Sequence, residues 1–265
     1  MKAVLSIAGS DSSGGAGIQA DIKTIAAHHL FAETAITALT AQNTLGVAGV
    51  LDVDPDFVEA QIDAVYDDIR PAAVKVGMVS SPGIIEAVAR ALERHRAENI
   101  VVDPVMVATS GARLIDEDAV AALRARLLPL ADIITPNMPE AEVLCGFAAN
   151  DDASMERAAR ELAGLVRGAV VVKGGHGAER ADDVLVTAEG TVVWLRSPRV
   201  DTKNAHGTGC TLSSAIACGL AKGLPMEDAV RAAKDYVRGA LAAGLDLGRG
   251  SGPLDHMWEY EASTA

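Results

Sequence analysis

Short apolar runs alternate with amphipathic segments along most of this chain. The intervening segments 57–70 and 83–97 repeat apolar side chains at the spacing of a helix. The apolar runs are rich in β-branched residues and occupy residues 2–9, 72–79, 99–106, 132–137 and 169–175. This alternation is typical of a parallel sheet that is covered on both faces. The pattern predicts an α/β fold with a mostly parallel central sheet between two layers of helices.

The pattern changes after Gly175. Residues 182–198 read as two strands joined around Glu189 and Gly190, which predicts a β-hairpin at one edge of the sheet. Two helices rich in alanine follow. Because no repeat, linker or shift in composition interrupts the sequence, we predict a single domain over residues 1–258 and a frayed tail over residues 259–265.

The composition limits the possible functions. With 265 residues, 49% of them hydrophobic, the chain can build one large core. Its formal net charge of −13 argues against binding to nucleic acid or to an anionic membrane surface. The apolar helical segments carry charges such as Arg124 and Lys222, so we expect no membrane span. Three cysteines, an odd number, fit a reducing compartment, and we expect a cytoplasmic protein.

Polar residues follow several of the predicted strands directly. They are Asp103, Asn137, Glu140 and Lys173, the last followed by two glycines. Ligands bind beyond the carboxyl ends of the strands in an open parallel sheet. A lysine beside glycines can reach a phosphate, and carboxylates with an amide can hold Mg²⁺ directly or through its waters. Together these residues predict a nucleoside triphosphate site, although Asn137 and Glu140 could instead form a capping box and Asp103 could satisfy a strand end.

Two glycines precede Cys210 in the segment NAHGTGCTLSSA, residues 204–215. Glycines at the start of a helix allow backbone N–H groups to turn toward a ligand, and the helix dipole favours an anion there. The alternative is a turn and an ordinary helix with Cys210 as a buried thiol.

The chain lacks the phosphate-binding loop GxxxxGK[ST], but residues 15–20 read GAGIQA and match GxGxxA. Five residues separate Gly9 from this segment, whereas a dinucleotide fold places its first glycine directly after the strand. A nicotinamide-dependent dehydrogenase, with Glu33 as the acid that binds ribose, is therefore a second and less favoured interpretation.

The sequence resembles the hydroxymethylpyrimidine kinase/phosphomethylpyrimidine kinase family of thiamine biosynthesis, within the ribokinase-like superfamily, from the first strand to Pro253. The motifs that carry the resemblance are AGSDSSGGAGIQADIKT, ITALTAQNTLGV, KVGM, VVDPVM, TPNMPEAE, VVKGGH and TKNAHGTGCTLSSAIA. Relatives that act on sugars usually have an aspartate at the position of Cys210, which favours the pyrimidine and pyridoxal branch.

The resemblance implies a three-layer α/β/α ribokinase-like fold and an ATP-dependent kinase. Its substrate would be 4-amino-5-hydroxymethyl-2-methylpyrimidine, phosphorylated to the monophosphate and then to the diphosphate. A pyridoxal or pyridoxine kinase is the alternative within the same superfamily. The family also implies a homodimer, Mg²⁺ and a monovalent cation.

The resemblance assigns the phosphoryl-transfer site to four consecutive residues. Gly207, Thr208, Gly209 and the N–H of Cys210 would form the anion hole, and Cys210 would be the base for the substrate hydroxyl. A thiol near a helix N-terminus has a lowered pKa, which suits this role.

The nucleotide and metal residues are implied in the same way. Lys173 would bind the ATP phosphates, and Asn137 would belong to the Mg²⁺ network with Asp103 and Glu140. Lys234 would lie near the nucleotide, unless it is a solvated helix lysine.

The implied pyrimidine pocket consists of Gly9, Asp21, Gln42, Met78 and Val105. The Gln42 amide offers both the donor and the acceptor that an aminopyrimidine requires. Asp21 would accept from the exocyclic amine or be a surface acid, and Met78 would otherwise be a core residue.

A flap over residues 107–113, hinged at Gly111, would cover the substrate. Pyridoxal-specialised relatives tend to carry a cysteine in this flap where the present chain has Ala108, which favours the pyrimidine. We also expect Lys203 and His206 to hold the charged monophosphate.

Overall fold

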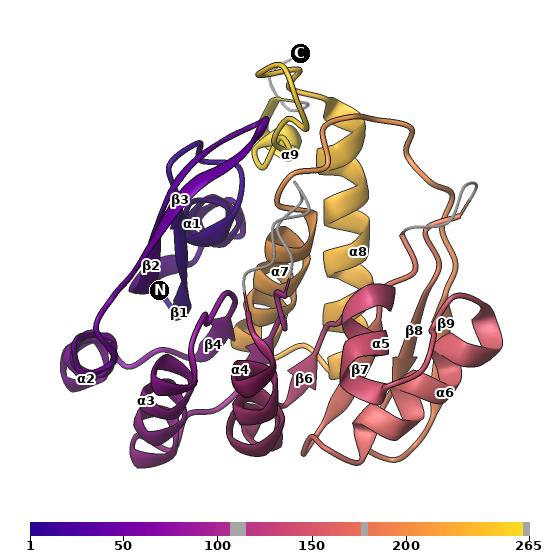
Figure 1. Ribbon diagram of the computed structural model, residues 1–265. Helices are drawn as coiled ribbons and strands as arrows, with labels where there is room; N and C mark the ends of the chain where they lie inside the picture. Colours follow the sequence, from indigo (N-terminus) through magenta and orange to yellow (C-terminus); the bar gives the residue numbers. More distant parts are fainter. Residues whose placement is uncertain (107–114, 176–179, 262–265) are drawn as a thin grey trace.

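The computed structural model describes residues 1–106, 115–175 and 180–261, and their strands form one sheet of nine in the order β3-β2-β1-β4-β5-β6-β7-β8-β9 (Figure 1). The strands are β1 Ala3–Asp11, β2 Phe31–Asn43, β3 Gly46–Asp52, β4 Ala73–Val76, β5 Ile100–Val102, β6 Ile133–Ile134, β7 Ala169–Val172, β8 Asp183–Val186 and β9 Val192–Leu195. The strands from β2 to β7 in this order pair in parallel. Each of the five predicted apolar runs overlaps one of these strands, and the predicted α/β class is confirmed, although the parallel strand β2 was not among the predicted runs.

Helices cover both faces of the sheet (Figure 1). The helical segments are α1 Gly17–Ala27, α2 Pro55–Asp68, α3 Pro82–Arg94, α4 Glu117–Ala122, the π-helical turn η1 Leu123–Leu127, the 3₁₀ turn η2 Leu128–Leu130, α5 Met138–Cys145, α6 Asp152–Ala163, α7 Thr208–Lys222, α8 Met226–Ala243 and α9 Trp258–Glu261. Helices α2 to α6 pack in one hydrophobic cluster with one face of the sheet. Helices α1, α7 and α8 pack in a second cluster with the other face.

Neighbouring residues of the central strands belong to different clusters. In β1, Leu5 and Ile7 join the first cluster and Val4 joins the second, and all three have no exposed surface. Successive side chains of a strand point to opposite faces, so a strand between two helix layers is apolar at most positions, and a buried polar residue such as Ser6 or Lys75 needs a buried partner. This requirement is why these strands were recognisable in the sequence.

Antiparallel strands close the sheet at both edges. The predicted hairpin is confirmed, because β8 pairs antiparallel with β9 at the edge of the sheet. β8 also pairs antiparallel with β7, which joins the hairpin to the parallel strands. At the other edge, β3 pairs antiparallel with β2, and this ribbon was not predicted. Its residues from Ala48 to Asp52 are exposed, so β3 has no buried face to produce an apolar pattern.

The predicted frayed tail is wrong for residues 259–261. They belong to α9, where the Tyr260 hydroxyl donates to the Ala27 carbonyl at 3.0 Å. Trp258 lies so close to α8 that a Cβ on Gly239 would come within 2.2 Å of its ring. Residues 262–265 lie outside the described residues. Within the described part of the chain, none of the helices has the length and apolar character needed to cross a bilayer.

Glu33 of β2 is a buried carboxyl group on the side of the sheet that α2 covers. Its exposed fraction is 8%, and its Oε2 has no hydrogen-bond partner among the described residues. The buried hydroxyl of Tyr66 on α2 also has none there. Burial, with a smaller contribution from Asp68, raises the pKa of Glu33 to about 7. An ionised Glu33 therefore destabilises the fold.

We predict that Glu33→Gln stabilises the protein at pH 8 and not at pH 4.5. At pH 4.5, its unfolded pKa, the carboxyl is neutral in the folded state and only half ionised in the unfolded chain, so little stability is lost there; the unfolded chain ionises fully as the pH rises toward about 7. The free energy of unfolding at pH 8 should therefore rise by about 1–3 kcal/mol in the variant. Urea unfolding at both pH values measures this difference. The exposed Glu98→Gln is the control, and equal gains at both pH values would contradict the prediction.

Candidate active site

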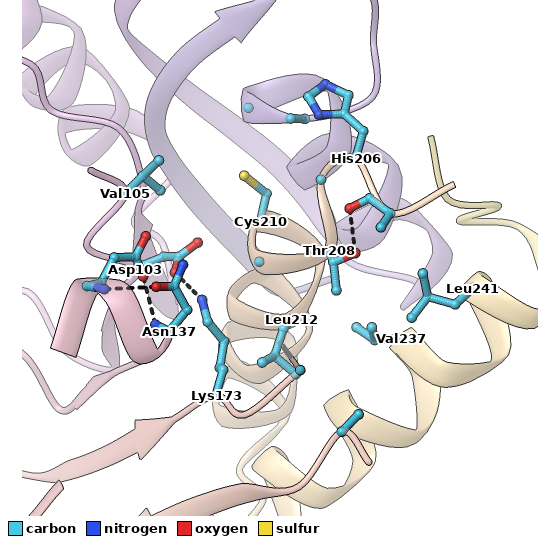
Figure 2. Close-up of a pocket in the computed structure, with 18 of the residues that line it drawn as sticks. Asp103, Val105, Asn137, Lys173, His206, Thr208, Cys210, Leu212, Val237 and Leu241 are labelled. Carbon is cyan, nitrogen blue, oxygen red and sulfur yellow. Dashed lines mark hydrogen bonds and ion pairs between the residues drawn. The ribbon is translucent and has the colours of Figure 1, made fainter. Parts of the chain in front are cut away.

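A cavity of about 770 Å³ lies along the carboxyl ends of the parallel strands. Figure 2 shows Cys210 between Asp103, Asn137 and Lys173 on one side and His206 and Thr208 on the other. Of the residues predicted for the site, those that line the cavity are Gly9, Gln42, Met78, Asp103, Val105, Asn137, Glu140, Lys173, Gly207, Thr208, Gly209, Cys210 and Lys234. Asp21 does not line it. His206 also lines the cavity, so the structure brings together the described residues that were predicted for the phosphate and pyrimidine sites, except Asp21 and Lys203.

The first turn of α7 is open to an anion. Gly207 is the N-cap residue with φ of +88°, and no described side chain caps the helix. A Cβ on Gly207 would lie 1.9 Å from the Gly15 carbonyl oxygen, so glycine is required for two reasons. The first turn also carries no acidic residue. Its backbone N–H groups and the positive end of the helix dipole are therefore available to a phosphate.

Lys173 and Asp103 form an ion pair beside this helix start. Lys173 Nζ donates to Asp103 Oδ1 at 2.9 Å, and the Thr135 hydroxyl donates to the same oxygen at 3.1 Å. Burial would lower the pKa of Lys173, but the carboxylates of Asp103 and Glu140 raise it above its ordinary value. A Cβ on Gly209 would lie 3.1 Å from Asp103 Oδ2 and 3.3 Å from Lys173 Nζ, so Gly209 lets this pair approach α7.

Asn137 and Glu140 cap α5, as the alternative interpretation expected. The Asn137 side chain accepts from the Glu140 N–H at 2.9 Å, and the Glu140 carboxylate accepts from the Asn137 N–H at 2.8 Å. Burial raises the pKa of Glu140 to about 7. Both residues still line the cavity, so the capping role and a ligand role are compatible. Across the described residues, no three His, Cys, Asp or Glu side chains are grouped to hold a metal ion.

Cys210 is the third residue of α7 and is half-buried at the cavity. Burial raises the pKa of its thiol to about 11, although the charge of Lys75 opposes this rise. The lowered pKa expected for a thiol at a helix start is therefore wrong. The loss of solvent around the sulfur outweighs the favourable charge and the helix position.

The predicted contact of Asp21 with the substrate is wrong, because Asp21 is a buried partner of other side chains. Its carboxylate has no exposed surface and accepts from Lys75 Nζ at 2.8 Å, the Ser6 hydroxyl at 2.5 Å and the Ser214 hydroxyl at 2.7 Å. It is neither a substrate contact nor a surface acid. The available signal was Lys75, a lysine inside an apolar strand, because a buried ammonium requires a buried carboxylate.

Asp11 and His206 form a buried hydrogen-bonded pair that sequence reasoning missed as a unit. His206 Nε2 lies 2.8 Å from Asp11 Oδ2, and both residues line the cavity. Asp11 also accepts the N–H groups of Gly15 and Ala16 at the start of α1. Burial would raise the pKa of Asp11, but hydrogen bonds, the largest from His206, lower it to about 2.

Gln42 and Met78 line the end of the cavity that was predicted to hold the pyrimidine, here called the acceptor end. The Gln42 Oε1 lies 3.1 Å from the Thr40 hydroxyl, and its Nε2 lies 3.3 Å from His206 Nε2. A Cβ on Gly9 would lie 3.2 Å from Met78 Sδ, so this glycine leaves room for the methionine at the cavity wall. Met78 is therefore a lining residue, although its packing is close.

Two predicted lysines differ from expectation. Lys203 Nζ pairs with Asp246 at 2.6 Å on the exposed surface and does not line the cavity, so its predicted contact with the monophosphate is wrong. Lys234 is not a solvated lysine, because its Nζ donates to the Ala181 carbonyl and to Asp183 Oδ2, both at 2.5 Å. The predicted flap over residues 107–113, with Ala108 and Gly111, lies outside the described residues.

An uncapped helix start opposite a lysine, at the carboxyl edge of a parallel sheet, is typical of proteins that hold and transfer phosphate groups. Comparison with known proteins narrows this class. The family model for phosphomethylpyrimidine kinase matches residues 11–255, and the chain belongs to this family. It is therefore a kinase with a ribokinase-like α/β fold.

Individual relatives agree. A hydroxymethylpyrimidine/phosphomethylpyrimidine kinase of Rhizobium meliloti is 52% identical over 260 residues, which cover 97% of each chain. The thiamine biosynthesis bifunctional protein ThiED of Geobacter sulfurreducens is 49% identical over 97% of this chain and 53% of its own. The structure of Bacillus subtilis pyridoxal kinase with ADP matches with a TM-score of 0.91 at 37% identity, covering 98% of this chain and 99% of that one. The dehydrogenase interpretation is wrong, and Glu33 does not line the cavity.

We predict that Gly207→Ala lowers the stability of the fold more than Gly223→Ala. Gly207 caps the start of α7 and Gly223 caps its end, and their φ angles are nearly equal, at +88° and +91°. A Cβ on Gly223 meets nothing within 4 Å, so only the backbone penalty of about 1 kcal/mol applies there. At Gly207 the clash with Gly15 adds to that penalty and shifts the helix start. Urea unfolding should show at least about twice the loss for Gly207→Ala. Equal losses of unfolding free energy in the two variants would show that the start of α7 is not in close contact with Gly15 before α1.

Proposed function

We propose that this kinase transfers a phosphoryl group from ATP to the hydroxyl of 4-amino-5-hydroxymethyl-2-methylpyrimidine and then a second one to the resulting monophosphate, in thiamine biosynthesis. The observation that carries the proposal is that Cys210 lines one cavity together with Lys173, the carboxylates of Asp103 and Glu140, and Gln42. The names of the relatives support the substrate.

The nucleotide would occupy the side of the cavity formed by α7 and α8. Leu212, Val237 and Leu241 supply apolar lining there (Figure 2), which suits a flat heterocyclic base. Lys173 is the cation placed to receive the phosphates. Lys234 would help to position the nucleotide from α8, where its pairing with Asp183 holds it in place.

Mg²⁺ would enter with the ATP phosphates. Asp103 and Glu140 carry buried carboxylates at the cavity, and carboxylate oxygens with water are the donors that Mg²⁺ prefers. Because no third His, Cys, Asp or Glu of the described residues is grouped with them to hold a metal, these residues fit an ion that they contact through its waters. The bound ion would neutralise charge on the phosphates, and a monovalent cation would add to this.

The pyrimidine would occupy the opposite side, among Gly9, Gln42, Met78 and Val105. An aminopyrimidine presents a ring nitrogen as acceptor and an exocyclic amine as donor. The Gln42 amide can donate to the ring nitrogen through its NH₂ group and accept from the amine through its oxygen. The Thr40 hydroxyl donates to the oxygen of this amide, and His206 lies beside its nitrogen. The hydroxymethyl group then points toward Cys210.

In the reaction, the sulfur of Cys210 accepts the hydroxyl proton while the alcohol oxygen bonds to the γ-phosphorus and ADP leaves. The N–H groups from Gly207 to Cys210 stabilise the charge on the transferred phosphoryl group. Because the thiol pKa is about 11, only a small thiolate fraction is present at neutral pH. The base therefore limits the rate more at low pH than at high pH.

Pyridoxal is the second candidate substrate, favoured by the close fit to pyridoxal kinase. We rank pyridoxal below the pyrimidine because the chain is 52% identical to a hydroxymethylpyrimidine/phosphomethylpyrimidine kinase and 37% identical to this pyridoxal kinase. We further propose that the enzyme is a cytoplasmic homodimer. Its three cysteines are free, and the exposed Leu39, Val50 and Leu51 give the ribbon of β2 and β3 an apolar surface that a second copy would cover.

We predict that Cys210→Ala lowers kcat by at least about a hundredfold and leaves the affinity for ATP within a few-fold, the effect of losing a general base. In the unchanged protein, kcat should rise by about tenfold per pH unit between pH 6 and pH 9, because the thiolate fraction does so below the thiol pKa. A coupled assay of ADP release measures both. Cys145→Ala, a half-buried thiol on α5, is the control and should retain its activity. Near-normal turnover by Cys210→Ala would remove the base assignment.

We predict that excess ATP converts the free alcohol to the monophosphate and then to the diphosphate. The same helix start serves both rounds, because the ring remains at Gln42 while the new phosphate takes the acceptor position after ADP leaves. Raised salt should slow the second step more, because its acceptor is charged. Phosphorus NMR follows both products, and parallel reactions with pyridoxal compare the two substrates. Monophosphate that accumulates without diphosphate would reduce the enzyme to a single-step kinase.

A further inference from the structure

A buried ion pair lies directly beneath the acceptor end of the cavity. Lys75 of β4 and Asp21 of α1 have no exposed surface, and Lys75 Nζ lies 3.0 Å and 2.8 Å from the two Asp21 oxygens. A Cβ on Gly77 would lie 2.7 Å from that ammonium and 3.2 Å from the Ala8 Cβ. Ala8 lines the cavity, as does Met78, the residue after Gly77. The lysine charge is thus one residue layer below the cavity wall.

The helix register places this pair next to Cys210. The Ser214 hydroxyl of α7 donates to Asp21 of α1 at 2.7 Å, so the two helices meet there. Cys210 precedes Ser214 by four residues, and Gly17 precedes Asp21 by four, so both lie one turn nearer the helix starts on the same faces. The Gly17 N–H accordingly faces the Cys210 sulfur. The thiol and the ion pair are therefore one helical turn apart.

Four charged groups from different elements surround the thiol. Lys75 from β4 favours the thiolate, and Asp21 from α1 and Asp103 after β5 oppose it. Lys173 after β7 also interacts with Cys210. Lys75 is the largest charge effect on the thiol.

A buried ion pair is weak evidence for stability, since apolar side chains of the same volume often serve as well. We propose that Lys75, held through Asp21 and its Ser6 and Ser214 partners, is a positioning residue whose ammonium stabilises the Cys210 thiolate, the form that then takes the substrate proton. This role rests on the proposed function of Cys210 as the base. The O–H bond of the substrate breaks, the S–H bond forms, and the alcohol oxygen replaces ADP on phosphorus.

Alkylation of Cys210 by iodoacetamide at pH 7.5 tests the proposal, because the thiolate is the form that reacts. Fragment-ion mass spectrometry of peptide 204–222 assigns the label to Cys210, because Cys218 lies on the same peptide. Lys75→Met should slow alkylation, and Asp21→Asn should accelerate it, each by at least about threefold. Structural damage alone would move both rates in the same direction.

Lys222→Met is the matched control, since it makes the same substitution at the far end of α7. It lies 12 residues from Cys210, roughly 18 Å along the helix, where salt screens its charge. Its alkylation rate should stay within about twofold of the unchanged protein. In the kinase assay, Lys75→Met should also lower kcat by at least about tenfold with little change in KM for ATP.

If a single variant does not fold, Lys75→Met/Asp21→Asn removes both charges and leaves none unpaired. It should alkylate more slowly than the unchanged protein, because the lysine has the larger effect. Rates that move in the same direction in the two single variants, an unchanged rate in the double variant, or an unchanged kcat in Lys75→Met would overturn the proposal. Alkylation needs neither ATP nor pyrimidine. An inactive kinase with opposite alkylation responses would therefore contradict only the proposed function.

Discussion

Helices α1 and α7 begin side by side at the carboxyl edge of the sheet, and the site depends on the contact between their starts. Gly207 touches the Gly15 carbonyl where any side chain would overlap it. One residue earlier, His206 is hydrogen bonded to Asp11, which also binds the first N–H groups before α1. Because these contacts fix α7 against β1 and α1, they set the position of both the anion hole and the thiol.

Local charge, rather than overall charge, prepares this acidic protein for phosphate. The net charge is −13, yet the described lysines at and below the cavity, Lys173, Lys234 and Lys75, are each held by a carboxylate. A phosphate approaching the helix start therefore meets paired lysines and backbone dipoles rather than a broad positive field. A bound phosphate would therefore compete with Asp103 for the ammonium of Lys173.

The sequence allowed the centre of the sheet to be predicted because burial on both faces leaves an apolar run, as in β1 and β7. It did not reveal β2, which has exposed or half-buried residues at most positions, or β3, whose residues are mainly exposed, because neither carries such a pattern. Residues that line the cavity follow strand ends or a glycine-rich helix start, so their place could be predicted from position in the chain. Asp21 and Cys210 show the limit, because the partners of a carboxylate and the solvent lost by a thiol depend on residues far away in the chain.

Helix α7 is built mainly of small residues, and each residue from Thr211 to Ala221 is buried. It lies so close to α8 that a Cβ on Gly219 would come within 2.8 Å of the Ala229 Cβ. Larger side chains have no room there, so this half of the site tolerates little variation. The wall with Gly9, Gln42 and Met78 is formed by strand ends and loops, which accept change more readily. A lineage that adopts a new acceptor would therefore alter that wall and inherit the phosphate-handling helix unchanged.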